Sequence, residues 1–105
     1  MNDIDNAVFK LIREHSPYGD KRPITKETDF RSDLRMIWED VNDMMGEYFE
    51  KFHIEPGKYE LITYYPKQQP LRPFLRLFGV AKAEPPPKLT AGMLIESAKA
   101  GRWLY

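Results

Sequence analysis

The stretch DLRMIWEDVNDMMGEYFEKFHI, residues 33–54, decides the fold. Its apolar side chains recur with a period of 3.6 residues, which predicts an amphipathic helix of roughly five turns. They are Leu34, Ile37, Trp38, Val41, Met44, Met45, Tyr48, Phe49 and Phe52. Ser32 or Asp33 is the expected N-cap, and the sequence HIEPG, residues 53–57, ends the helix. Gly46 in the interior costs about 1 kcal/mol relative to alanine and indicates a close neighbour.

Two further helices are predicted near the ends of the chain. The first is capped by Asn2 or Asp3 and ends near His15, because apolar residues from Ile4 onward share one helical face. A loop follows at residues 16–29, which contain two prolines and a glycine. The last helix begins after Thr90 as its cap and ends at Gly101.

The segment between the second and the last helix is less regular. Residues 58–66 fit either a strand or a short helix or turn, and we favour the helix or turn. Residues 71–79 predict a short amphipathic helix, and the triple proline within residues 84–88 predicts an extended connector. Trp103 and Tyr105 are expected to fold back on the core. The sequence therefore predicts an all-α fold in a single domain, residues 1–105.

Composition narrows the classes of function. The 105 residues contain sixteen basic and sixteen acidic side chains, so nucleic acid is not an expected partner. The two halves of the chain differ in net charge, however, because residues 1–60 are acidic overall and residues 61–105 are basic. The chain has no cysteine, no secretory signal pattern and no stretch near the ~20 apolar residues that span a bilayer. We therefore expect a soluble, cytoplasmic protein that does not act mainly at membranes.

Four sequence stretches together resemble the acyl carrier protein family across most of the chain. They are ITKETDF at residues 24–30, DL at 33–34, FHIE at 52–55 and LTAGMLIESAKAG at 89–101. Phe30, Asp33, Leu34 and Phe52 occupy the places of the family's Phe, Asp-Leu and second Phe. The resemblance implies a small four-helix bundle, here with an inserted segment between helix two and the last helix. The closing LTAGMLIESAKAGRW is also similar to a bacterial family of short proteins of unknown function that is related to carrier proteins.

The chain departs from the carrier pattern at the position that would hold the prosthetic group. Carrier proteins attach phosphopantetheine to a serine that follows the Asp-Leu pair, and this position is Trp38 here. An indole has no hydroxyl group, and Ser16, Ser32 and Ser97 do not lie in the required Asp-Ser-Leu context. We therefore expect no cofactor. Trp38 itself fits packing against the core, or a contact with a partner.

The sequence contains few of the residue types that usually act in catalysis or metal binding. His15 and His53 are the only histidines, they fall at the ends of different predicted helices, and neither lies at metal-ligand spacing. Glycine-rich phosphate loops and calcium-loop patterns are absent from the sequence. We therefore expect no metal, no catalytic residue and no enzymatic activity.

The second helix has an acidic face. Glu39, Asp40, Asp43 and Glu47 occur with no basic residue between positions 36 and 50. Like charges four residues apart repel on a helix, so this pattern indicates a surface that could steer a basic partner. In carrier proteins this helix is the recognition surface, and the resemblance implies the same four residues here. An ordinary solvated face, or pairing with Arg72 and Arg76, is the alternative.

The sequence predicts a non-enzymatic, carrier-like interaction or adaptor domain without a phosphopantetheine arm. Its partner would be a basic protein surface, with enzymes of acyl chains or fatty acids as candidates. One alternative is a true carrier protein that is modified on another serine. The other is a lipid-handling or membrane-surface protein that acts through residues 71–80, where apolar residues alternate with Arg72 and Arg76.

Overall fold

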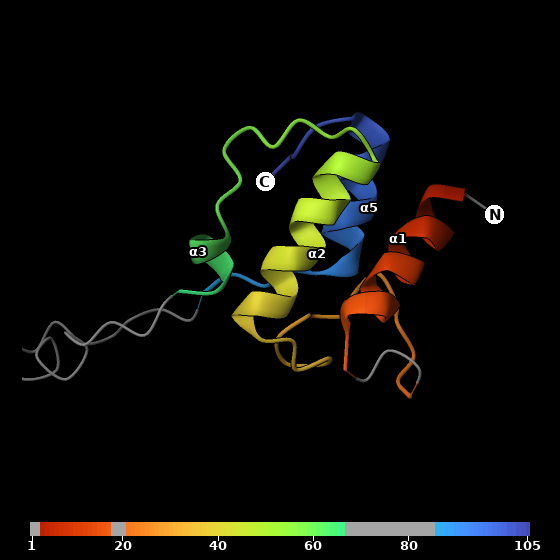
Figure 1. Cartoon of the computed structure of the whole chain (residues 1–105), viewed down its shortest axis with the longest axis vertical. Coiled ribbons are helices and arrows are strands. Elements are labelled where there is room, and N and C mark those ends of the chain that lie inside the picture. Colours follow the sequence, from red (N-terminus) through yellow and green to blue (C-terminus); the bar gives the residue numbers. More distant parts are fainter. Residues whose placement is uncertain (1–2, 18–20, 67–85) are drawn as a thin grey trace, which may run out of the picture.

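The computed structural model of the chain describes residues 3–17, 21–66 and 86–105 (Figure 1). Within these residues the secondary structure is helical, without a β-strand, which confirms the predicted all-α class. The helices are α1 (Asp3–His15), α2 (Trp38–Lys51), α3 (Leu61–Tyr64) and α5 (Ala91–Ala100). The predicted first and last helices and the short helix within residues 58–66 are thus confirmed. The predicted helix at 71–79 and the first part of the connector at 84–88 lie outside the described residues.

The core lies between three helices. α1 packs against both α2 and α5, and Figure 1 shows it beside these two. The buried faces follow the apolar periodicity of the sequence, as with Val8, Leu11 and Ile12 on α1. α2 is tied to α5 by the Tyr48 hydroxyl, which donates to the Leu94 carbonyl at 2.6 Å in the buried interior. A buried hydroxyl needs such a partner, so this bond also orients α2.

The start of the second helix was predicted too early. α2 begins at Trp38 rather than at Leu34. Residues 29–34 instead form a turn in which the amides of Asp33 and Leu34 donate to the Asp29 carbonyl, at 3.0 and 3.3 Å. Arg35 then adopts a left-handed conformation with φ 52°, which interrupts any helix at that point. Leu34 is nevertheless fully buried, so its place in the apolar pattern reflects packing of the turn.

The predicted caps serve this turn and not α2. Ser32 donates its hydroxyl to Asp29 Oδ2 at 2.7 Å, and Asp33 Oδ2 accepts from the Asp29 amide at 2.8 Å. The N-cap of α2 is Ile37, whose side chain makes no capping hydrogen bond. At its other end α2 is followed by His53 with φ 53°, also left-handed. Both ends of α2 are therefore bounded by non-glycine residues with positive φ.

The close neighbour predicted for Gly46 is absent, because a Cβ built there meets nothing within 4 Å. The glycine with a close neighbour is Gly92, in the first turn of α5. A Cβ on Gly92 would lie 2.9 Å from the Lys26 carbonyl oxygen, which accepts the Gly92 amide at 2.8 Å. Thr90 caps α5 as predicted, accepting from the Met93 amide, and Gly101 ends it with φ 76°.

The C-terminal residues complete an aromatic cluster. The Trp103 amide donates to the Glu55 carbonyl at 2.8 Å, and the indole is only 6% exposed. Its ring lies 5.1 Å from Tyr59 and 6.0 Å from Phe49, measured between centroids. The prediction that Trp103 folds back is confirmed. The Tyr105 ring contacts Trp103, at 5.7 Å between centroids, but the residue remains 54% exposed, so Tyr105 covers the edge of this cluster and does not enter the core.

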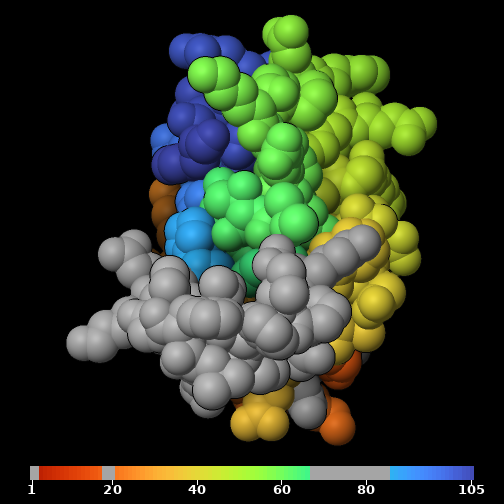
Figure 2. All heavy atoms as spheres, turned by 90° about the vertical axis from the view of Figure 1, so that its left-hand side faces the viewer, coloured from red at the N-terminus to blue at the C-terminus, as the bar shows by residue number. Residues whose placement is uncertain are grey.

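One face of the molecule gathers segments that are distant in the sequence. Figure 2 shows the residues around α3 in its centre, with the C-terminal residues on one side and α2 on the other. α3 is held there by Leu61 and Tyr64, which are buried, whereas Ile62 is 48% exposed. This arrangement places α3 next to the turn that precedes α2, and the two form the walls of a cleft.

Candidate functional site

The outer face of α2 carries the four acidic residues that the sequence singles out. Glu39 and Asp43 are exposed, one helical turn apart, and Asp40 is half-buried. α2 contains no lysine or arginine before Lys51 at its end. Glu39 and Asp43 form no salt bridge with any residue of the described part of the chain. The negative charge of this face is therefore directed at solvent.

Glu47 differs from the other three because it contacts α1. Its Oε2 lies 2.6 Å from His15 Nε2, and this hydrogen-bonded pair joins the end of α1 to α2. The Glu47 side chain is 48% exposed, so the pair lies at the surface. Sequence reasoning missed this contact because the two residues are 32 positions apart. Glu39 and Asp43, in the first half of α2, are thus the residues of the acidic face that point to solvent without a salt bridge to another described helix.

Trp38 occupies the first position of α2 and packs, half-buried, against the core. The structure therefore confirms the packing role of this indole. Of the serines, Ser97 is fully buried beneath the C-terminal residues. Ser32, in the turn before α2, is exposed, but its hydroxyl donates to Asp29. The side chain at the start of α2 is thus an indole, and the hydroxyl of the preceding turn is engaged internally.

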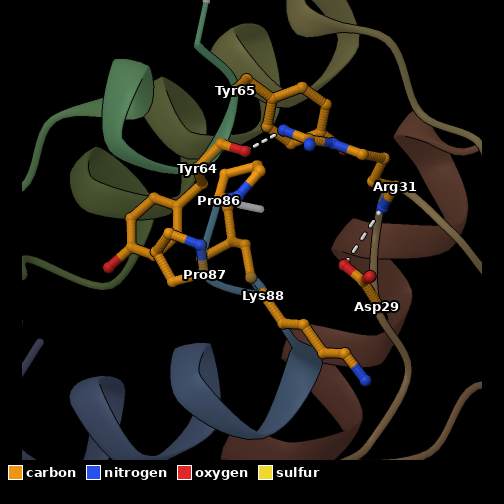
Figure 3. Close-up of a pocket in the computed structure, with 8 residues that line it drawn as sticks. Asp29, Arg31, Tyr64, Tyr65, Pro86, Pro87 and Lys88 are labelled. Atoms are coloured by element: carbon orange, nitrogen blue, oxygen red, sulfur yellow. Dashed lines mark hydrogen bonds between the residues drawn. The ribbon is translucent and has the colours of Figure 1, made fainter. Parts of the chain in front are cut away.

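A cleft opens between the turn at residues 29–31, the end of α3 and the chain that leads into α5 (Figure 3). Its volume is about 220 Å³ when the space open to solvent is included. It is lined by Asp29, Arg31, Tyr64, Tyr65, Pro86, Pro87, Lys88 and Leu89. Three segments far apart in the sequence build it, so sequence patterns gave no signal for it.

Arg31 is the most constrained charge in this cleft. Its guanidinium donates to the Tyr64 carbonyl and lies over the Tyr65 ring, with 4.5 Å between Cζ and the ring centroid. Such cation–π stacking fixes the orientation of a planar guanidinium. The backbone amide of Arg31 also donates to Asp29 Oδ1 at 3.3 Å. The side chain is therefore held on two sides before any ligand binds.

The tyrosines near the cleft remain neutral at ordinary pH. Burial raises the pKa of Tyr65 to about 12, although the nearby Arg31 guanidinium acts in the opposite direction. Burial also raises the pKa of Tyr64 and Tyr59 above the usual value for a phenol. The shift therefore favours the protonated form of these hydroxyls.

The described residues contain no group of three or more His, Cys, Asp or Glu side chains placed to hold a metal ion. None of the helices in the same part of the chain combines the length and the apolarity that a membrane crossing requires.

A protein-family model described as "Protein of unknown function (DUF1493)" matches residues 1–105. No curated protein and no solved structure matches the chain.

Proposed function

The chain belongs to the DUF1493 family, whose description assigns no function, and we therefore propose one from its surface. We propose that it is a non-enzymatic interaction or adaptor domain that docks a basic protein surface through the outer face of α2. The observation that carries this proposal is the pair Glu39 and Asp43, which are exposed on a helix without a basic residue before Lys51.

This surface is unfavourable for the isolated helix. Carboxylates four residues apart cost a few tenths of a kcal/mol each, about as much as opposite charges would contribute. The helix dipole offsets this only within the first turn, where Glu39 and Asp40 lie. Asp43 lies beyond that turn, so its charge is uncompensated by the helix. A partner with lysine or arginine side chains would remove the repulsion and would be attracted at a distance.

The resemblance to acyl carrier proteins supports the same proposal. Trp38 stands at the first position of α2, where the resemblance would place the serine that carries phosphopantetheine. An indole cannot form the phosphodiester, and the Ser32 hydroxyl is engaged with Asp29. The chain would therefore act as a carrier-like docking domain without the arm. Enzymes of acyl-chain or fatty-acid metabolism with basic docking surfaces are the candidate partners.

A charge-reversal experiment tests the docking face. The variant combines Glu39→Lys and Asp43→Lys, and Glu96→Lys, at an exposed carboxylate on α5, is a control for charge reversal elsewhere on the surface. Immobilised full-length protein would be used to capture proteins from its native cells at low and at raised salt. We expect the wild type and the control to retain the same basic proteins at low salt, and the double variant to lose them. Equal retention by all three proteins would refute the role of α2.

A mass measurement separates the adaptor from a true carrier protein. The chain would be co-expressed with a phosphopantetheinyl transferase and its intact mass determined. We expect the mass of the unmodified chain. A gain equal to one phosphopantetheine arm would reject the proposal, and Ser32→Ala would then show whether Ser32 carries the arm.

A further inference from the structure

The cleft between Arg31, α3 and Pro86–Lys88 is small and open, because its empty space of about 220 Å³ includes open solvent. The enclosed part is far smaller than the roughly 300–1,000 Å³ of sites for drug-sized ligands, so it suits a single chemical group. Figure 3 shows Arg31 and Tyr65 on one side of the open space and Pro86 and Pro87 on another. No residue of α2 lines the cleft, although Asp40 of α2 acts electrostatically on Tyr65 in its wall.

The Arg31 guanidinium has more N–H donors than the hydrogen bonds within the described residues use. A guanidinium carries five N–H groups, and within the described residues one nitrogen, Nη2, donates to the Tyr64 carbonyl. No carboxylate in that part of the chain forms a salt bridge with it. Stacking on Tyr65 holds the plane of the guanidinium in place. A guanidinium whose plane is already fixed loses little side-chain entropy when it binds a carboxylate or phosphate.

Asp29 is the opposing charge in the cleft, and its oxygens are occupied. Oδ2 accepts from the Ser32 hydroxyl at 2.7 Å, and Oδ1 accepts from the Arg31 amide at 3.3 Å. The residue is only 8% exposed. Lys88 also lines the cleft, and Figure 3 shows its side chain running away from Arg31. Arg31 is therefore the cation that faces the cleft, and the one carboxylate in the lining is already bound by the turn.

We propose that this cleft binds one oxyanion group, a carboxylate or a phosphate, with Arg31 as its bidentate donor. Pro86 and Tyr64 form part of the remaining wall. This site differs from the docking face, because it would attract anions whereas the docking face would attract cations.

The test is a titration of the full chain, labelled with ¹⁵N, followed by NMR. The probes are inorganic phosphate and acetate, each added at constant ionic strength maintained with chloride, so that the two arms distinguish phosphate from carboxylate. For at least one probe we expect saturable shifts at the amides of Asp29, Arg31, Tyr65 and Leu89. Arg31→Met should abolish saturation, and Arg31→Lys should weaken binding roughly tenfold, because lysine lacks the fork.

The controls keep the outcome decisive. Arg35→Met removes an exposed arginine that does not line the cleft, and it should leave the titration unchanged. Arg31→Lys keeps the positive charge and decides the matter if Arg31→Met does not fold. Shifts that fail to saturate, or that persist unchanged in the Arg31 variants, would show an adventitious ion only and overturn the proposal.

Discussion

Replacing Trp103 by alanine should remove much of the stability of the fold. The indole is 6% exposed and lies among the rings of Phe49, Tyr59 and Tyr64, with centroid distances of 5.1–6.3 Å. Truncation of a buried aromatic side chain to alanine costs about 3–5 kcal/mol, because transfer and cavity terms add. Domains of this size are stable by about 5–15 kcal/mol. Trp103→Ala should therefore lose at least a fifth of the free energy of unfolding.

Urea unfolding measured by far-UV circular dichroism checks this prediction. With an m-value of about 1–3 kcal/mol/M, the midpoint should fall by roughly 1–5 M while the m-value stays constant. Leu104→Ala is the matched control, because Leu104 is the next residue and is 43% exposed. Its effect should stay within about 0.5 kcal/mol. A loss below about 1 kcal/mol for Trp103→Ala would refute the packed aromatic cluster.

Three further predictions concern stability. Gly92→Ala should destabilise the protein by about 1–3 kcal/mol in thermal unfolding, because its Cβ would meet the Lys26 carbonyl at 2.9 Å; an unchanged melting temperature would contradict that close approach. Gly46→Ala should instead stabilise it by up to about 1 kcal/mol, because the position is helical and open; a loss would reveal a neighbour. Burial raises the pKa of Tyr65 from 10.0 to about 12, so the folded state holds this proton more tightly and stability should decline from pH 10 to 12. Tyr65→Phe should reduce that decline in urea titrations across the same pH range, and an equal slope in both proteins would contradict it.

The helices were predictable from the sequence where packing and local signals agree. The apolar period identified the buried face of α2, and Thr90 and Gly101 marked the ends of α5. The start of α2 was misplaced because Ser32 and Asp33 are good caps in any context, and here they bind Asp29 and stabilise a turn. Short polar side chains stabilise such turns as readily as helix ends, so their presence does not decide between them.

The sites depend on contacts that no local pattern encodes. The acidic face could be predicted because its residues share one helix. The pairing of Glu47 with His15 could not, because it depends on how α1 lies against α2. The Arg31 cleft needs the turn before α2, the end of α3 and the chain before α5 to meet. The tight position of Gly92 likewise depends on the approach of Lys26.

The left-handed residues at both ends of α2 have a consequence for selectivity. Arg35 and His53, with φ of 52° and 53°, prevent the helix from growing in either direction. Within α2 the Cα atoms of Glu39 and Asp43 are separated by about 6 Å along the axis, four residues at 1.5 Å each. If α2 docks a basic partner as we propose, a partner with cations at the same spacing would contact both side chains at once. The spacing would then discriminate between partners of equal net charge.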